Sequence, residues 1–319
     1  MFCKFTKLCY TKDMKFNMHW IKFKTAIGVF LAKFIYNFNK FVPGVKVRRN
    51  VRYIQNGNRY NKLDIFYAKS DSVVNKPVII YFHGGGWAAY SKSCYSTVCK
   101  RLASMGYVVF NCNYSLTPRY TMSRIVSDAV SAILFTYKNA EKFGGDPKRV
   151  CLAGDSAGAH ISSLISGLST SKEGVNWFGE DNQKLFASII KANILFYGAY
   201  DLNSIIFTDF PNIKTYINGI IDIDGPTAPS YLKKYSPVTY VTNNFPATFM
   251  SSGAIDPLHE SQSMVFSDML KKRNVKLNKL FFEPEEFRAM HAYMIVDGLK
   301  TTEMTFEGVE AFLNEVFDK

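Results

Sequence analysis

A five-residue turn sequence constrains most strongly how this chain can fold. Residues 154–158 read Gly-Asp-Ser-Ala-Gly, and they lie between an apolar run at residues 149–153 and a helix-like segment that begins at Ser156. A turn from a strand directly into a helix crowds the backbone, so small residues are needed two positions before and two after the central serine. Such a turn lifts the Ser156 hydroxyl out at the carboxyl end of a sheet, beside the positive end of the helix dipole. This context favours a nucleophile at Ser156 over a plain Gly-rich turn.

A second glycine-rich segment follows another predicted strand. Residues 77–82 form an apolar run, and residues 83–87 continue it as His-Gly-Gly-Gly-Trp. Glycines lack Cβ atoms, so their backbone can approach a ligand and direct N–H groups at it, as an oxyanion hole requires. The residues expected to form this hole are Gly84, Gly85, Gly86 and Ala157. We expect His83 to brace the loop by hydrogen bonds rather than to act as a base. A phosphate-binding loop is disfavoured because no Gly-Lys-Ser/Thr ending follows.

The rest of the chain alternates between strand-like and helix-like segments. A hairpin is predicted where residues 45–55 and 60–67 flank an Asn-Gly-Asn turn. Further strands are predicted at residues 77–82, 107–112, 149–153, 187–197, 247–251 and 276–282, and helices at residues 92–105, 123–143, 260–272 and 302–317. This alternation predicts a mostly parallel sheet covered by helices on both faces, with an antiparallel hairpin at its start. Residues 202–235 interrupt it and predict an insertion that forms a lid over one end of the sheet.

The net charge of +13 is concentrated at the amino-terminal end. Residues 1–52 hold twelve basic residues and one acidic residue, so the remainder of the chain carries only +2. Residues 20–42 have the periodicity of an amphipathic helix with a narrow lysine stripe, and their uncharged stretch is too short to span a bilayer. We expect this arm to pack as a cap on the protein, and peripheral contact with a membrane surface is the alternative. The broad apolar face disfavours nucleic-acid binding.

The six cysteines show no metal-ligand spacing. Cys112 and Cys151 lie in apolar runs and are expected to be buried thiols. A reduced, cytoplasmic protein, with membrane association left open, is the simplest interpretation, although an even number of cysteines also permits disulfides.

The two glycine motifs together resemble those of the α/β-hydrolase superfamily, specifically the hormone-sensitive-lipase-like carboxylesterases. The longer run at residues 143–160 is also similar to kynurenine formamidases and prenylcysteine methylesterases. The resemblance covers residues 45–319. It implies an α/β-hydrolase fold, a serine esterase activity without a cofactor, and a cap built partly from amino-terminal helices.

The resemblance also orders the catalytic partners, because in this fold an acid and then a histidine follow the serine. His291 follows the last predicted strand, where the family places its base, and His259 is the rival. His160 lies one helical turn after Ser156 and would point into the helix packing. For the acid, Asp256 matches the Asp-Pro-Leu segment of the family, and the rival Asp201 would instead cap the insertion helix.

These observations predict an arm or cap at residues 1–44 and a catalytic domain at residues 45–319, with a cap insertion at about residues 202–235. The predicted activity is hydrolysis of short-chain carboxylic esters by Ser156, His291 and Asp256, since caps of this kind enclose a small pocket. Amidase, formamidase and prenylcysteine methylesterase activities on the same triad stay open. A catalytically silent binding module is disfavoured because serine, acid and histidine are all present.

Overall fold

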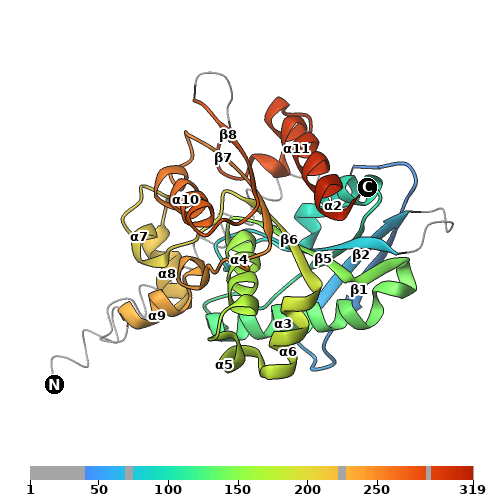
Figure 1. Cartoon of the computed structure of the whole chain (residues 1–319), viewed down its shortest axis with the longest axis horizontal. Helices are drawn as coiled ribbons and strands as arrows, with labels where there is room; N and C mark the ends of the chain where they lie inside the picture. Colours follow the sequence, from blue (N-terminus) through green and yellow to red (C-terminus); the bar gives the residue numbers. More distant parts are fainter. Residues whose placement is uncertain (1–39, 69–74, 222–227, 285–288, 319) are drawn as a thin grey trace.

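An eight-stranded sheet forms the centre of the molecule (Figure 1). The computed structural model describes residues 40–68, 75–221, 228–284 and 289–318, so most of the predicted arm lies outside the described residues. The strands are β1 (Val45–Arg52), β2 (Lys62–Ala68), β3 (Lys76–Phe82), β4 (Val108–Cys112), β5 (Gly145–Asp155), β6 (Ile190–Phe196), β7 (Ala247–Gly253) and β8 (Leu277–Phe282). Their order is β1-β2-β4-β3-β5-β6-β7-β8, and β2 alone runs against its neighbours. The predicted mostly parallel sheet with an antiparallel start is confirmed.

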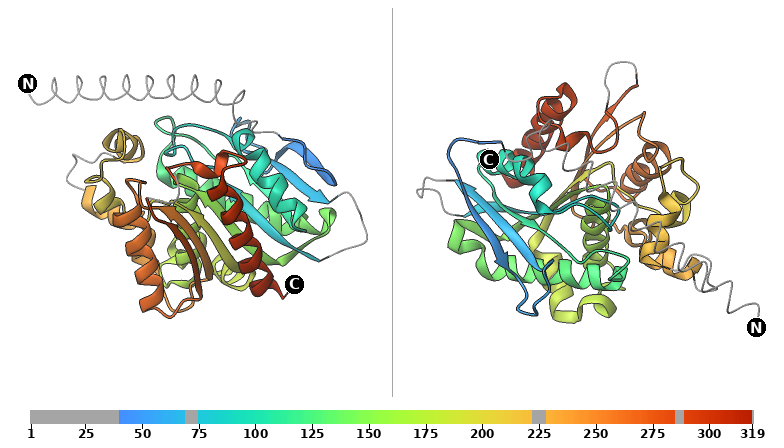
Figure 2. Two further views of the ribbon diagram at one scale, coloured as in Figure 1. Left: turned by 90° about the horizontal axis from the view of Figure 1, so that it is seen from above. Right: turned by 180° about the vertical axis from the view of Figure 1, so that it is seen from behind.

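Helices cover both faces of this sheet (Figure 2). The α-helices are α2 (Ser96–Ser104), α3 (Met122–Asn139), α4 (Ala157–Thr170), α5 (Gly174–Phe178), α6 (Glu180–Ile189), α7 (Leu202–Ile205), α8 (Ile213–Ile220), α9 (Ala228–Lys234), α10 (Val265–Lys272) and α11 (Lys300–Phe317). Shorter 3₁₀ turns are η1 (Lys92–Tyr95), η2 (Ala140–Phe143), η3 (Pro237–Tyr240) and η5 (Tyr293–Ile295), and a π-helical turn η4 (His259–Met264) leads into α10. Within the described part of the chain, every helix is too short or too polar to cross a membrane.

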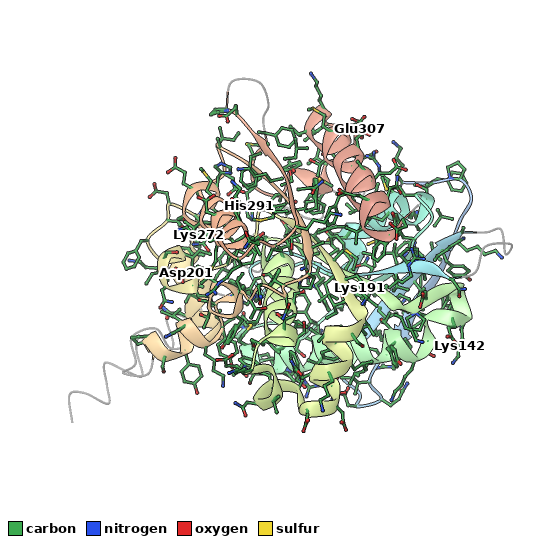
Figure 3. All side chains as sticks on the ribbon, viewed as in Figure 1. Lys142, Lys191, Asp201, Lys272, His291 and Glu307 are labelled. Atoms are coloured by element: carbon green, nitrogen blue, oxygen red, sulfur yellow. The ribbon has the colours of Figure 1, made fainter. Side chains whose placement is uncertain are left out.

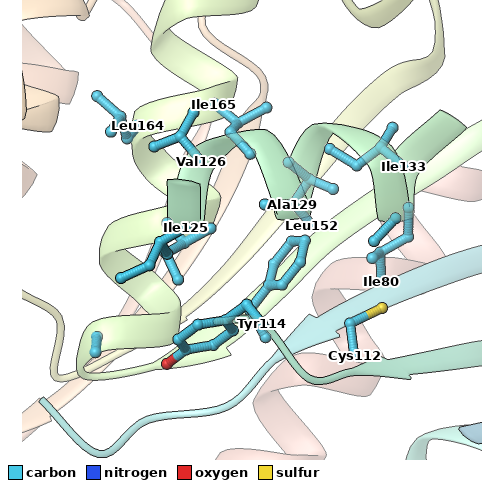
Figure 4. Close-up of a cluster of buried hydrophobic side chains, with 14 of the residues drawn as sticks. Ile80, Cys112, Tyr114, Ile125, Val126, Ala129, Ile133, Leu152, Leu164 and Ile165 are labelled. Atoms are coloured by element: carbon cyan, nitrogen blue, oxygen red, sulfur yellow. The ribbon is translucent and has the colours of Figure 1, made fainter. Parts of the chain in front are cut away.

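Strand periodicity divides the core between the two faces. On β3, Ile80 packs with α3 and α4, whereas its neighbours Ile79 and Tyr81 pack with α2 and α11. The first of these clusters is drawn in Figure 4, where Ile80 and Leu152 of the sheet meet apolar side chains of both helices. Alternate side chains of a strand point to opposite faces, so a strand covered on both sides reads as a continuous apolar run.

Several element boundaries differ from the sequence expectation. The strand expected from residue 187 begins at Ile190, because Phe186 and Ile189 are buried at helical spacing on α6. The hairpin strands end at Arg52 and resume at Lys62, because the side chains of Asn56 and Asn58 each accept a hydrogen bond from the main chain two residues on and widen the turn.

The strand order reverses direction at one point of the sheet. The chain passes from β3 outward to β4 and then returns to β5 on the other side of β3. Ligands of open α/β sheets bind beyond the carboxyl ends of the strands at such a switch point. The glycine loop follows β3 and Ser156 follows β5, so both predicted motifs lie at this switch point.

Candidate active site

The turn at Ser156 has the strained backbone that its sequence predicts. Ser156 has φ 49° and ψ −115° between the end of β5 and the start of α4. A Cβ atom on Gly158 would collide with the carbonyl oxygen of Phe82, and one on Gly154 would collide with the main chain of Gly158. Glycine is therefore needed at both positions for α4 to pack this closely against the end of β3.

A chain of hydrogen bonds joins Ser156, His291 and Asp256. His291 Nδ1 lies 2.8 Å from Asp256 Oδ2, and His291 Nε2 lies 2.9 Å from Ser156 Oγ. An ionised carboxylate can only accept, so Nδ1 carries the proton and Nε2 accepts from the serine hydroxyl. The three residues follow β5, β7 and β8, whose carboxyl ends lie at one edge of the sheet.

Surrounding groups fix the orientation of the acid and the imidazole. The Asp256 side chain is only 1% exposed, and its Oδ1 accepts a hydrogen bond from the Leu258 amide at 2.9 Å. The His291 ring packs edge-to-face with two aromatic rings, at centroid distances of 5.0 Å to Tyr197 and 4.7 Å to Phe210. The imidazole is therefore held by its two hydrogen bonds and by edge-to-face packing.

The rival residues have other partners. Asp201 accepts from the Asn203 amide and caps α7, as its alternative role predicts. His259 Nδ1 lies 3.0 Å from Ser252 Oγ. His160 is buried within the packing of α4, as expected. Figure 3 labels both Asp201, beside α7, and His291.

The glycine loop forms one wall of the site, with one departure from expectation. His83 Nδ1 donates to the Gly84 carbonyl at 2.7 Å, and its ring stacks on Tyr114, consistent with the expected bracing role. Burial lowers the pKa of His83 to about 4, so the ring is neutral. The amide of Gly84 donates to Asp155 Oδ1 at 2.8 Å and does not point at the site, which corrects its inclusion among the expected oxyanion donors. Gly85 and Gly86 line the cavity in front of Ser156.

The carboxylate of Asp155 lies beneath this loop. It accepts hydrogen bonds from Gly84, from the Tyr95 hydroxyl at 2.9 Å and from the Tyr81 hydroxyl at 3.3 Å. Complete burial raises its pKa from 3.8 to about 6, although these donors favour the charged form. Asp155 therefore joins the loop after β3 to the turn after β5.

A cavity of about 120 Å³ opens beside Ser156 and His291. Phe210 and Tyr216, from the segment between β6 and η3 that carries α7 and α8, line it together with Tyr90. The sequence predicts an insertion at residues 202–235 but not which of its side chains reach the cavity; its aromatic residues are the signal that could have indicated them. A larger cavity of about 510 Å³ lies elsewhere, between α3, α5 and α9, and neither Ser156 nor His291 lines it.

The described cysteines are free thiols buried in the core. Burial raises the pKa of Cys112 and of Cys151, so both thiols are protonated and unreactive, as expected. Cys3 and Cys9 lie outside the described residues.

Comparisons with known proteins agree with this geometry. The BD-FAE family model matches residues 63–270. The chain is 27% identical over 270 residues to esterase LipQ of Mycobacterium tuberculosis, covering 82% of this chain and 61% of that protein. It is 28% identical over 270 residues to a probable isoprenylcysteine alpha-carbonyl methylesterase of Arabidopsis thaliana. That match covers 80% of this chain and 59% of the relative. The chain thus spans about three fifths of the length of these relatives.

Solved esterase structures share the fold. Esterase B from Lactobacillus rhamnosis has a TM-score of 0.82 and 19% identity, covering 96% of this chain and 97% of that one. The same esterase inhibited by a C4-C4 tributyrin phosphonate has a TM-score of 0.80, also at 19% identity. That match covers 96% of this chain and 97% of the esterase chain. Because the family model matches well over half of the chain and the sheet has the same architecture as these esterases, the chain belongs to the BD-FAE family and has the α/β-hydrolase fold.

Proposed function

We propose that the protein is a serine carboxylesterase that hydrolyses short-chain carboxylic esters through an acyl-enzyme. The observation that carries the proposal is the unbroken hydrogen-bonded chain from Asp256 through His291 to Ser156, at the wall of a small cavity. The sequence relatives named as esterases support the same reaction class.

In the acylation step, Ser156 Oγ attacks the ester carbonyl carbon while His291 Nε2 takes the hydroxyl proton. Asp256 accepts the Nδ1 proton of His291 in a hydrogen bond and stabilises the imidazolium that forms. The tetrahedral intermediate collapses, the bond to the alcohol oxygen breaks, and His291 returns the proton to the leaving alcohol. Water, deprotonated by His291, then attacks the acyl carbon; the bond from that carbon to Ser156 Oγ breaks, His291 returns the proton to Oγ, and the carboxylic acid leaves.

Negative charge on the intermediate requires fixed donors. The amides of Gly85 and Gly86 on one side and of Ala157 at the start of α4 on the other are the proposed donors. Gly85 and Gly86 have φ of 110° and 58°, a backbone that favours glycine and that lets the loop curve around the cavity.

The size of the cavity supports a short acyl group. Pockets for drug-sized ligands measure roughly 300–1,000 Å³, whereas the cavity beside Ser156 measures about 120 Å³. Esterase B, a structural relative, is inhibited by a C4-C4 tributyrin phosphonate and by a C6-C4 compound, and short chains of this kind are compatible with the proposal. A prenylcysteine acyl group is much larger, which weighs against methylesterase activity on such substrates.

We propose that residues 202–235 form a cap that limits the cavity, because Phe210 and Tyr216 come from this segment. Residues 1–44 are proposed to complete the cap. Peripheral membrane contact through residues 20–42 is the competing interpretation, and truncation distinguishes the two.

Hydrolysis of p-nitrophenyl acetate, butyrate, octanoate and laurate tests the proposal, with N-formylkynurenine assayed alongside for formamidase activity. We expect the acetate and butyrate to be hydrolysed fastest and Ser156→Ala to lower kcat by at least about a thousandfold. Full activity in Ser156→Ala would contradict the proposed mechanism. Faster turnover of N-formylkynurenine than of any ester would favour the formamidase alternative.

A further inference from the structure

The indole of Trp87 makes a buried hydrogen bond that the proposed reaction does not use directly. Trp87 ends the His-Gly-Gly-Gly-Trp segment, is 2% exposed and has φ 57°. Its Nε1 lies 3.2 Å from Nδ1 of His160, which is fully buried in the first turn of α4. The loop after β3 is therefore bonded to α4, the helix that directly follows Ser156.

The second ring nitrogen of His160 determines its tautomer. Nε2 lies 2.7 Å from the carbonyl oxygen of Tyr235, at the end of the proposed cap insertion. A carbonyl only accepts and an indole N–H only donates, so Nε2 carries the proton and Nδ1 accepts from Trp87. Both bonds thus require one tautomer of the neutral imidazole. Burial lowers the pKa of His160 to about 4 and keeps it in that neutral form.

The opposite end of the glycine loop is also bonded to the turn that carries Ser156. The Gly84 amide donates to Asp155 Oδ1 at 2.8 Å. The residue before Ser156 therefore holds one end of the loop, and the residue four positions after it holds the other end. Between these two attachments lie Gly85 and Gly86, which line the cavity.

We propose that His160 is a positioning residue that sets the amides of Gly85 and Gly86 against Ser156 through its hydrogen bond to Trp87. This inference rests on the proposed esterase function and adds a role to a histidine whose place in the sequence predicts only helix packing. Loss of one oxyanion donor lowers kcat by about 100- to 1,000-fold. A loop that is only loosened keeps its donors in part, so we expect an effect of about 10- to 100-fold on kcat.

Four variants separate positioning from packing. Leucine at 160 fills space without hydrogen bonds, and glutamine can replace the Nε2 donor toward Tyr235 but not the Nδ1 acceptor. Asparagine places its amide oxygen near the position of Nδ1, so His160→Asn can still accept from Trp87. Trp87→Phe removes the indole donor and keeps an aromatic ring.

We expect His160→Leu, His160→Gln and Trp87→Phe each to lower kcat for p-nitrophenyl acetate by about 10- to 100-fold, with KM changed less than about threefold. His160→Asn should recover most of the lost kcat. The double variant Trp87→Phe/His160→Leu should be no slower than the slower single variant, because both changes remove the same bond. Ser169→Ala is the matched control, since its hydroxyl donates within α4 to the Ser166 carbonyl at 2.8 Å and we expect kcat to be unchanged.

Other results would overturn the proposal. A wild-type kcat in His160→Leu or in Trp87→Phe contradicts it. A double variant whose loss of kcat is the product of the two single losses also contradicts it. So does a loss of kcat in His160→Asn as large as that in His160→Leu. If His160→Leu does not fold by circular dichroism, Trp87→Phe and His160→Asn decide. Absence of Ser156-dependent turnover in the wild type contradicts the esterase function itself, which distinguishes that failure from a failure of the His160 proposal alone.

Discussion

At the scale of single residues, the buried carboxylate of Asp155 has the clearest electrostatic consequence. Its pKa rises from 3.8 to about 6 because burial penalises the charged form. The folded state therefore binds this proton more tightly than the unfolded chain does. Stability contributed by protonated Asp155 is fully present below pH 3.8 and is lost as the pH rises toward about 6.

Replacing Asp155 by asparagine removes this titration while preserving the size of the side chain. We expect the free energy of unfolding of the wild type, relative to Asp155→Asn, to fall as the pH rises from about 4 to about 6 and then to level off. Urea unfolding of both proteins across this range measures the difference, in which groups common to both proteins cancel. A difference that rises with pH would contradict the raised pKa.

Removing the carboxylate of Asp256 should lower activity, whereas removing that of Asp201 should lower stability. Asp256 bonds to His291, whereas Asp201 caps α7. We expect Asp256→Ala to lower kcat by about 10⁴-fold. Asp201→Ala should leave kcat within about threefold and lower the free energy of unfolding by about 1 kcal/mol. Steady-state kinetics and urea unfolding of both variants measure these effects, and the reverse pattern would exchange their roles.

At the scale of elements, the segment that carries α7 and α8 sets the shape of the cavity. Phe210 lines the cavity and contacts the His291 ring, whereas Phe207, three residues earlier, is 82% exposed. The same short segment thus supplies one aromatic side chain to the site and one to the surface. Replacing Phe210 changes the cavity and replacing Phe207 changes only the surface, so the two variants separate the effect of cavity size from that of surface hydrophobicity.

We expect Phe210→Ala to raise the ratio of kcat/KM for p-nitrophenyl octanoate over acetate by about tenfold, because the larger cavity admits a longer chain. Because both substrates are measured on the same variant, any loss of activity from a loosened His291 lowers both kcat/KM values and cancels in their ratio. Phe207→Ala should leave the ratio unchanged. Equal shifts in both variants would show that surface hydrophobicity, not cavity size, sets the preference.

At the scale of the whole molecule, charge separates the amino-terminal segment from the body. Residues 1–52 carry a net charge of +11 and the remaining residues only +2. The described chain begins at Lys40, whose ammonium lies 2.7 Å from Asp297 Oδ2 and whose carbonyl accepts from Lys100. Asp297 lies six residues after His291, so Lys40, where the described chain begins, is bonded to the segment that follows the catalytic histidine.

Deleting residues 1–39 tests whether the arm is a cap. We expect the truncated protein to keep its cooperative unfolding transition, to change its ester chain-length profile, and to bind vesicles of anionic lipid no less than the full chain does. Co-sedimentation and the p-nitrophenyl series measure these outcomes. An unchanged profile together with lost vesicle binding would instead support the membrane interpretation.

The sequence alone determined those features whose causes are local. The turn at Ser156 depends on glycines within two residues and on the strand and helix that flank it, so it could be predicted from one short segment. The alternation of apolar strands with amphipathic helices similarly predicted the mostly parallel sheet. Boundaries were less certain, as at Ile190, because helix and strand patterns overlap where both are half-buried.

Tertiary structure decided which distant groups meet. His291 lies 135 residues from Ser156, and chain order could nominate it but could not give its bonds to Ser156 and Asp256. The engagement of the Gly84 amide by Asp155, the entry of Phe210 into the cavity and the bond from Trp87 to His160 left no sequence pattern. Each joins elements that become neighbours only when the strands align in the sheet, because hydrogen bonds and packing act over a few ångströms of space and not along the chain.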